Sequence, residues 1–367
     1  MKRKLLLFLA IAATVALQAS DICVDGIYYL FNGDEATVTY KGAIHYEDMK
    51  FYHDTVTIPE KVTYKDKVYP VTQIGEGAFW CCQDLTCVNI PNSVKVIGTS
   101  AFYFCSLEEV NIPDGVDSIA PHAFEAQFFK KLTIGKGLRT VAISAISGDD
   151  ALVSIEVSPC NPYFTSGDHC NAIINRETKE LILGCQNTKI PNYVKKIGVE
   201  AFYWCMGLTK IEIPQNVEIL ADGAFNACGL QEVILGPDVK VIGSGCFDMC
   251  MSLIKVTSYS TTPPTFVDGD YGFGLEEEVP IAIISVPTGT KGAYMATTGW
   301  GNYDNYEEIV VPSRKADEVM PPIKCEETDL DIIPANNELS TRKVIRNGRL
   351  FLYNNEHIYT ITGAKLQ

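Results

Sequence analysis

Basic residues and histidine are both scarce in this sequence. It has 30 lysines and arginines against 45 aspartates and glutamates, which gives a formal charge of −15, and only 5 histidines. A protein that binds DNA or RNA must neutralise phosphates with a positive surface, so this balance argues against nucleic acid as a partner. The histidines lie in separate segments, at positions 45, 53, 122, 169 and 357. Their spacing therefore indicates no metal site.

Motifs for catalysis and for cofactors are also missing. No glycine-rich loop joins a strand to a helix, which argues against nucleotide binding. His169-Cys170 places a base beside a nucleophile, but no third group is found to orient them. The acidic stretch 268–278 lacks the third acidic residue and the spacing of a calcium loop, so we interpret it as a solvated loop. We therefore expect a non-enzymatic protein without metal or cofactor.

Long apolar runs are absent after the first 20 residues. Residues 2–4 are Lys-Arg-Lys, residues 5–17 are apolar, and Ala19 and Ser20 are small. An apolar helix of this length spans roughly 20 Å, which is short of the roughly 30 Å hydrocarbon layer. The segment predicts a secretory signal peptide over 1–19 and no transmembrane span in the mature chain. We expect an exported protein at the cell surface or in the medium, with the periplasm as the alternative.

What the sequence does contain is a repeat. Segments of the form Ile/Leu-Gly/Ala-x-x-Ala/Cys-Phe begin at residues 74, 97, 197, 220 and 242. The phenylalanines at 79, 102 and 124 are 23 and 22 residues apart, and those at 202, 225 and 247 repeat this spacing. After each segment comes a short strand pattern. In Leu85–Asn89 the side chains of Leu85 and Val88 are expected to point inward, and those of Cys87 and Asn89 outward.

One such unit has an apolar face that it cannot bury alone, so the units must stack. The sequence predicts a repeat solenoid of the α/β leucine-rich-repeat type, with a parallel β ladder, short turns or helical pieces, and β caps at both ends. Because the same frame precedes and follows residues 160–190, we expect residues 74–258 to form one continuous curved array.

Residues 74–258 resemble the BspA-like leucine-rich repeats of bacterial surface proteins. The family pattern is Ile-Gly-x-x-Ala-Phe-x-x-Cys-x-x-Leu-x-x-Ile-x-Ile-Pro. The segments 26–30 and 56–62 look like the entry strands of that family, and 262–264, 284–287 and 299–300 like its exit cap. Two departures occur, since Gln127 occupies a cysteine position and the unit around Ala145 has lost its phenylalanine. The resemblance implies binding to proteins of a host or of neighbouring cells.

The domain organisation follows from these boundaries. We predict a signal peptide over 1–19, a β cap over 20–73, repeats over 74–258 with an inserted hairpin at about 160–190, and a C-terminal cap over 259–311. A polar linker is expected over 312–340. A short, basic, β-rich tail follows over 341–367 and resembles C-terminal tails on exported proteins of related bacteria. It is interpreted as a secretion or anchoring signal, or as a small sheet docked on the solenoid.

The cysteines mostly follow the repeat frame. They number 13, and five of them lie three residues after a repeat phenylalanine, at 82, 105, 205, 228 and 250. We expect these five to be packed, unpaired thiols, because stacked residues hold their Cβ atoms about 4.8 Å apart and parallel. If any pair is bridged, Cys170 and Cys185 are favoured, since they bracket the hairpin.

The outward strand positions form the candidate binding face. They are mixed in charge and free of aromatic rings, which favours a protein or peptide partner, such as a host surface or matrix protein, over a sugar. The alternative function is a glycan-capturing or enzyme-scaffolding accessory protein of a polysaccharide-using system. The candidate residues are Asn89, Glu109, Asn111, Lys131, Thr133, Glu156, Lys210, Glu212, Glu232, Lys255 and Thr257.

Overall fold

The structure is a computed structural model that describes residues 22–41, 52–126, 128–148, 151–167, 169–267, 273 and 283–325, and four strands between 341 and 366. The expected signal peptide, most of the acidic stretch 268–278 and residues 326–340 lie outside the described residues. The chain divides into two units, Met1–Pro321 and Pro322–Gln367. Each is considered by itself.

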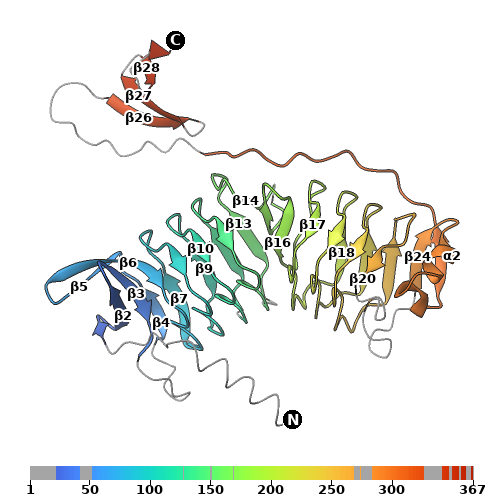
Figure 1. Ribbon diagram of the computed structural model, residues 1–367, viewed down its shortest axis with the longest axis horizontal. Helices are drawn as coiled ribbons and strands as arrows, with labels where there is room; N and C mark the ends of the chain where they lie inside the picture. Colours follow the sequence, from blue (N-terminus) through green and yellow to red (C-terminus); the bar gives the residue numbers. More distant parts are fainter. Residues whose placement is uncertain are drawn as a thin grey trace, which may run out of the picture. The chain divides into compact units, whose positions relative to one another are not determined.

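The first unit is a solenoid of short β coils arranged in a curved row (Figure 1). Each coil contributes an outward strand, a second strand of two residues and a turn that carries the Ala-Phe pair. In the coil after the N-terminal cap, these are β7 (Leu85–Asn89), β8 (Val96–Ile97) and the turn around Phe102. Leu85 and Val88 are buried while Cys87 and Asn89 are exposed, as the alternation predicts. The solenoid fold is therefore confirmed.

The outward strands pair in parallel with their neighbours along the row. They comprise β9 (Glu109–Ile112), β11 (Lys131–Ile134) and β13 (Ser154–Val157), then β18 (Lys210–Glu212), β20 (Glu232–Leu235) and β22 (Lys255–Ser258). The second strands do the same on another side of the coils. They are β8, β10 (Ser118–Ile119) and β12 (Thr140–Val141), then β17 (Lys196–Ile197), β19 (Ile219–Leu220), β21 (Val241–Ile242) and β23 (Thr265–Phe266).

Both ends of the row are covered by β structure. At the N terminus β1 (Cys23–Val24), β2 (Ile27–Asn32) and β3 (Glu35–Thr39) form an antiparallel meander, and β5 (Lys61–Tyr64) and β6 (Lys67–Ile74) form a hairpin joined to it through β3. The strand β4 (Asp54–Thr57) pairs with β7. At the other end β24 (Ile283–Pro287) and β25 (Tyr306–Ile309) continue the outward ladder. Helix is nearly absent from the described residues, with the five-residue α2 (Lys291–Met295) and the 3-10 turn η2 (Trp300–Asn302) in this cap.

Phenylalanine rings stack along the interior of the row. The centroids of Phe79 and Phe102 are 4.8 Å apart with nearly parallel planes, and those of Phe225 and Phe247 are 5.3 Å apart. All four rings are almost fully buried. Because the rings repeat at the spacing of the strands, each coil completes the burial of the previous one.

The ladder is interrupted near the middle of the row, which corrects the expectation of one unbroken array. The outward strands fall into the groups β4-β7, β9-β11-β13 and β18-β20-β22-β24-β25. After β13 comes the island, residues 160–190, which contains β14 (Phe164–Thr165) and the antiparallel hairpin of β15 (Ala172–Asn175) and β16 (Glu180–Gly184). The coils on both sides of the island still belong to one compact unit.

Side chains of the island cap the edge of β13 where the ladder stops. The backbone N–H of Ile155 donates to Asn171 Oδ1 at 3.4 Å, and that of Val157 donates to Ser166 Oγ at 3.2 Å. Asn161 is fully buried and donates to the carbonyls of two residues, Gly135 and Leu138, at 2.9 and 3.1 Å. These bonds satisfy polar groups that an interrupted sheet would otherwise leave unpaired.

The second unit is a four-stranded antiparallel sheet. Its strands are β26 (Thr341–Arg346), β27 (Arg349–Asn354), β28 (His357–Thr360) and β29 (Lys365–Leu366). Each strand pairs with the next along the chain, with β26 in register with β27 over six residues.

Replacing Phe225 with alanine should lower the free energy of unfolding by about 3–5 kcal/mol, because it removes a fully buried ring from the middle of a stack. Urea unfolding followed by circular dichroism measures the change. Phe128→Ala is the matched control, since 59% of Phe128 is exposed, and it should cost less than about 0.5 kcal/mol. Equal losses in the two variants would refute the stacking argument.

Candidate functional site

The structure places most predicted candidate residues on one side of the coils. This surface is called the outward face below. Asn89, Glu109, Asn111, Glu156, Lys210 and Glu212 are exposed, whereas Lys131, Thr133, Glu232 and Lys255 are partly buried. The island divides the face into an N-terminal row on β7, β9, β11 and β13 and a C-terminal row on β18, β20 and β22.

Thr257 is an exception to the predicted exposure, since its exposed fraction is 6%. It lies opposite Ile234 on one neighbouring strand and Ser285 on the other. A short side chain with a neighbour on each side is screened from water, so Thr257 does not contribute to an accessible surface.

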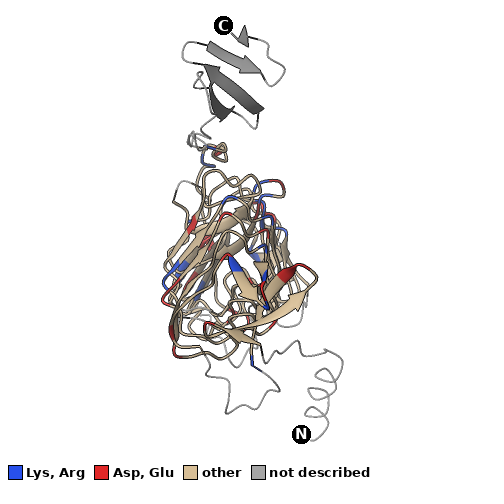
Figure 2. Cartoon of the chain, turned by 90° about the vertical axis from the view of Figure 1, so that its left-hand side faces the viewer, with Lys and Arg blue, Asp and Glu red and all other residues tan. Residues whose placement is uncertain are grey.

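Cross-strand ion pairs neutralise much of the outward face. Lys131 Nζ is 3.0 Å from Glu156 Oε1, and Glu232 receives both Lys210 at 2.5 Å and Lys255 at 3.8 Å. Figure 2 shows both signs of charge interspersed over the described coils. Such exposed pairs stabilise the fold by little, typically below about 1 kcal/mol each. They leave a flat polar surface without one dominant charge.

A strap crosses the C-terminal row. The strap comprises residues 311–321, which follow β25 and have no regular secondary structure. In Figure 1 this segment turns back over the coils and runs toward the island. Its contacts extend from Asp238, in the turn after β20, to Arg176 in the island.

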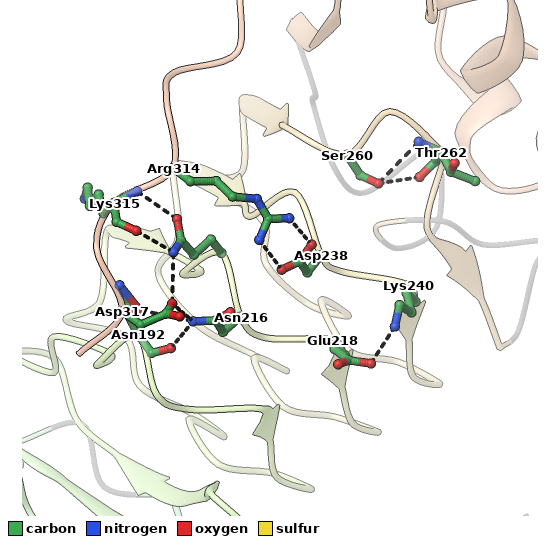
Figure 3. Close-up of polar contacts among 11 residues, drawn as sticks. Asn192, Asn216, Glu218, Asp238, Lys240, Ser260, Thr262, Arg314, Lys315 and Asp317 are labelled. Carbon is green, nitrogen blue, oxygen red and sulfur yellow. Dashed lines mark hydrogen bonds and ion pairs between the residues drawn. The ribbon is translucent and has the colours of Figure 1, made fainter. Parts of the chain in front are cut away.

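Paired hydrogen bonds fix the first part of the strap to the coils (Figure 3). The guanidinium of Arg314 donates to both carboxylate oxygens of Asp238, at 3.0 and 2.5 Å. The backbone N–H of Lys315 donates to Gln215 Oε1 at 2.9 Å, and Gln215 Nε2 donates back to the Lys315 carbonyl at 2.8 Å. The side-chain amide of Gln215 therefore acts as both acceptor and donor toward the backbone of a single strap residue.

The remaining strap contacts continue to the island. Asn192 Nδ2 donates to the Ala316 carbonyl at 2.7 Å, and Arg176 Nη1 donates to the Pro321 carbonyl at 2.7 Å. The predicted linker over 312–340 thus begins with residues that are bound to the solenoid. The sequence did not reveal this, because the bonding partners lie 76 to 145 residues away along the chain.

Asp317 completes this network. Its Oδ1 accepts hydrogen bonds from Asn216 Nδ2 at 2.8 Å and from Gln215 Nε2 at 3.4 Å. These bonds favour the charged carboxylate and hold the pKa of Asp317 below its ordinary value.

A cavity of about 610 Å³ lies between the strap and the coils. It includes Lys210 and Glu212 of the predicted face. Lys315 Nζ of the strap is 3.2 Å from Glu212 Oε1 in this cavity. Its lining residues come from the turns at 188–192 and 236–237, from β18 and the residues after it, from Tyr259, and from 311–315 with Glu318.

Aromatic side chains gather at the turns of the coils, away from the strands. This aromatic edge consists of Trp80, Tyr103, Phe104, Tyr203 and Trp204, which lie one or two positions after a repeat phenylalanine. The rings of Trp80 and Tyr103 are 6.4 Å apart, and those of Tyr203 and Trp204 are 6.1 Å apart. The sequence interpretation missed this group because it considered only the strand positions.

Two of these aromatic residues have an unfavourable backbone conformation. Phe104 and Trp204 have φ of 54° and 62°, and their exposed fractions are 39% and 43%. Glycine, at the corresponding position 148, adopts such a conformation without a steric penalty. Cys81, Ala126, Ala227 and Met249 adopt the same conformation at the corresponding positions of other coils, so the cost, on the order of 1 kcal/mol, belongs to the repeat turn and not to the aromatic rings.

Acidic groups accompany the aromatic edge. Burial raises the pKa of Tyr103, and the charges of Glu125 and Cys81 and the phenol of Tyr203 raise it further. Burial also raises the pKa of Tyr203, followed by Glu200 and Glu125. Both phenols are thus influenced by the same carboxylate, Glu125, although they belong to coils on opposite sides of the island.

The thiols lie where the repeat frame predicts them. Cys105, Cys228 and Cys250 each contact the carbonyl of a phenylalanine in the preceding coil, at Sγ–O distances of 3.0, 2.9 and 3.1 Å. None of the cysteines forms a disulfide bond in the structure, and this includes Cys170 and Cys185, the pair favoured for a bridge. Cys170 is buried and directs its thiol to the Ser166 carbonyl at 2.5 Å, whereas His169 is exposed.

Two other kinds of site are absent from the described residues. No group of three or more histidine, cysteine, aspartate or glutamate residues is placed there to hold a metal ion. No helix in the same part of the chain is long and apolar enough to cross a membrane.

The fold and its surfaces define a β-solenoid repeat protein of the leucine-rich-repeat class. Residues 50–166 and 179–263 match the BspA type leucine rich repeat region in six copies, which covers more than half of the chain. The chain belongs to this family. Its repeats form an extended surface of the kind that repeat proteins use to bind other proteins.

Solved structures of bacterial leucine-rich proteins are similar to this chain. A leucine-rich cell surface protein of Faecalibacterium prausnitzii is 20% identical, with a TM-score of 0.41 over 78% of this chain and 94% of its own. A leucine-rich repeat protein of Eubacterium ventriosum is 21% identical, with a TM-score of 0.49 over 72% and 77%. The pneumococcal vaccine antigen PcpA is 17% identical, with a TM-score of 0.45 over 80% and 98%. No curated protein matches the chain.

The buried thiols should be unreactive in the folded protein. Burial raises the pKa of Cys250 from its ordinary 9.0 to about 12, so little thiolate forms near neutral pH. Alkylation at pH 8 with mass spectrometry should label the exposed Cys23, Cys87 and Cys325 but leave Cys250 unmodified. The folded state keeps a proton that the unfolded state loses, so the contribution of Cys250 to stability falls as pH rises from about 9 to 12. A disulfide between Cys228 and Cys250 would contradict this picture.

Proposed function

We propose that this protein is an exported, non-enzymatic protein that binds another protein at the bacterial cell surface through its outward face. The carrying observation is the row of outward side chains on successive parallel strands. In the N-terminal row, Asn89 on β7 and Asn111 on β9 are exposed at corresponding positions of neighbouring coils, and Glu109 is exposed on the same side of β9. Membership of the BspA type family supports a protein-interaction role.

The chemistry of this face is suited to a broad contact with a protein and not to a small ligand held in one pocket. Most of its lysines are paired with glutamates of the same face, as Lys131 is with Glu156, so no strong local field selects one small ligand. A protein partner gains affinity from a broad contact with a few anchoring residues. Adhesion to host surface or matrix proteins is the specific role that we propose.

The first test measures binding to purified matrix proteins and mucin by biolayer interferometry. Replacing Asn89, Glu109 and Asn111 together with alanine should weaken the measured Kd at least tenfold, because several contacts of the same face are lost. A chelator should leave the Kd unchanged.

The matched control is Arg139→Ala, Thr140→Ala and Lys240→Ala, which removes three exposed side chains away from the outward strands. Its Kd should stay within twofold of the unmodified protein. Equal weakening in both triple variants would contradict the outward face as the binding site. A failure of every matrix protein and mucin to bind would contradict the adhesive role.

A second candidate function, glycan capture, is favoured by the aromatic edge. Aromatic faces beside carboxylates suit sugar rings, which offer C–H groups for stacking and hydroxyls for hydrogen bonds. Phe104 and Trp204 present exposed rings on this edge, beside the other three aromatic side chains, and this exposure supports a role in recognition.

Affinity electrophoresis in neutral polysaccharide gels tests this second function. Trp80→Ala with Trp204→Ala should abolish any retardation by the polysaccharide. The control Met251→Ala with Phe128→Ala removes exposed apolar side chains that do not belong to the aromatic edge, and it should have no effect. Unchanged retardation in the tryptophan variant would exclude the aromatic edge as the sugar site.

A further inference from the structure

The turns that carry the Ala-Phe pair lie side by side along the row of coils. The backbone N–H of Phe79 donates to the Ala101 carbonyl of the next turn at 2.7 Å, and later turns are bonded in the same way. The hydroxyl of Ser144 donates to Glu200, which connects the last turn before the island with the first turn after it. The surface of these turns is called the turn edge here. It comprises residues 75–84, 98–106, 120–126, 128, 142–148, 198–207, 221–229 and 243–252.

Large apolar side chains are exposed along the turn edge. The exposed fractions of Phe104 and Trp204 are 39% and 43%, and those of Met206 and Met249 are both 52%. The aromatic edge belongs to this surface, and the methionines extend it into the coils after Trp204. A group of exposed apolar side chains is typical of a surface that a partner covers. Methionine suits such a surface because its flexible, polarizable side chain adapts to the shape of the partner.

The turn edge contains no lysine or arginine, although the chain has 30 of them. Among the described residues, no lysine or arginine forms an ion pair with the carboxylates of Glu76, Asp84, Glu200 or Asp222. The outward face differs, since most of its lysines are paired with glutamates. The acidic residues of the turn edge are Glu76, Asp84, Glu125, Glu200, Asp222 and Asp248.

The hydrogen bonds that these carboxylates accept do not cancel their charge. Glu200 accepts from the Ser144 hydroxyl, and Asp222 Oδ1 accepts from the Ser244 N–H at 2.8 Å, so both donors are neutral. Glu125 Oε2 is 2.5 Å from Nδ1 of His122, which is a cation only when the histidine is protonated. The turn edge therefore carries charge of one sign, and its field attracts cations.

Aromatic rings beside carboxylates select a cationic group on an apolar stem. The ammonium of lysine or the guanidinium of arginine is attracted to the face of a tryptophan or tyrosine ring, and a carboxylate adds a charge-assisted hydrogen bond. Rings and carboxylates do interact on this surface. After burial, the charge of Glu125 contributes to raising the pKa of both Tyr103 and Tyr203. A neutral sugar gains nothing from the net negative charge, which favours a basic protein segment as the occupant.

We propose that the turn edge binds a segment of a partner protein in which lysine or arginine is interspersed with apolar residues. The basic side chains pair with the carboxylates, and the apolar ones pack against Trp204, Met206 and Met249. The inference rests on the proposed protein-binding function, to which it adds a second surface and the chemistry of the segment bound there. The outward strands are not part of the turn edge, so the two surfaces are tested with different residues.

Fluorescence anisotropy on the full chain tests the proposal. The probe is a labelled twelve-residue peptide of four Lys-Leu-Ser repeats, and two comparison peptides have glutamine in place of lysine or serine in place of leucine. The probe should bind at least tenfold more tightly than the glutamine peptide and at least threefold more tightly than the peptide without leucine. Its affinity should fall as salt concentration rises, because the attraction between the charges is screened.

A variant without any change in charge separates a specific site from general attraction to an acidic protein. Trp204→Ala with Met249→Ala should weaken the probe at least fivefold, because an aromatic face and an apolar contact are lost together. The control Val68→Ala with Val310→Ala removes exposed apolar side chains outside the turn edge, and it should change the affinity less than twofold.

A second variant removes negative charge from the turn edge. Glu76→Gln, Asp84→Asn and Asp222→Asn together should weaken the probe at least tenfold, because three carboxylates that could pair with lysine become neutral amides. The amides keep the size of the side chains and, at position 222, an oxygen that can accept from Ser244.

The matched control removes the same charge elsewhere. Glu60→Gln, Glu177→Gln and Asp304→Asn replace exposed acids outside the turn edge, and together they should change the affinity less than threefold. Thermal unfolding midpoints within a few degrees of each other show that all variants fold.

Three outcomes would overturn the proposal: no binding of the lysine peptide, equal binding of either comparison peptide, or equal weakening in the turn-edge and control variants. Retardation by polysaccharide that requires Trp80 and Trp204, without binding of the lysine peptide, would also overturn it and assign the surface to a sugar. If the peptide fails but matrix protein still requires Asn89, Glu109 and Asn111, only this inference is lost. If the peptide binds but that triple variant has no effect, the outward-face proposal is lost instead.

Discussion

Every feature of the first unit depends on the stacking of coils that are too small to bury their own apolar side chains. The phenylalanine stack expresses this requirement directly, because a ring inside a stack, such as Phe102 or Phe225, is covered by the rings of the coils before and after it. The thiols reinforce it, as Cys228 and Cys250 contact the phenylalanine carbonyl of the preceding coil. Strand register, burial and the two caps follow from the same requirement, since any coil without a neighbour would expose its core.

The interruption by the island shows what happens when one coil departs from the frame. Ile146 replaces the phenylalanine, and the stack that contains Phe124 ends there. The next stack begins with Phe202, whose ring occupies the space beside Gly184. A Cβ atom added to Gly184 would lie only 2.1 Å from a ring carbon of Phe202. A glycine at this position of the hairpin is therefore required for the second set of coils to pack against the island. The solenoid stays compact although its hydrogen-bonded ladder does not continue.

The repeat period was sufficient to predict the coils, the buried positions and the packing of the repeat cysteines in the core, because stacking imposes the same environment on equivalent residues. Features outside the period were not predictable in this way. The strap is polar and irregular, and its bonds join Arg314 to Asp238 and Pro321 to Arg176 across long stretches of chain. The strand alternation predicted which side chains of the outward strands are at least partly exposed, apart from Thr257, whose burial depends on residues of neighbouring strands. The aromatic edge could have been found from the positions after each phenylalanine, where Trp80, Tyr103 and Trp204 recur.

The strap also determines where mechanical load enters the solenoid. The chain leaves the first unit at Pro321, beside the island, and not at the last coil. Tension applied from beyond Pro322 reaches the strap first, and its hydrogen bonds and ion pairs with the coils must break before the load reaches β25. Until they part, β24 and β25 are shielded from the pull, and their release frees about 35 Å of chain from the 11 residues of the strap. A protein anchored through its C-terminal unit would thus have a short extensible element that yields before the repeats unravel.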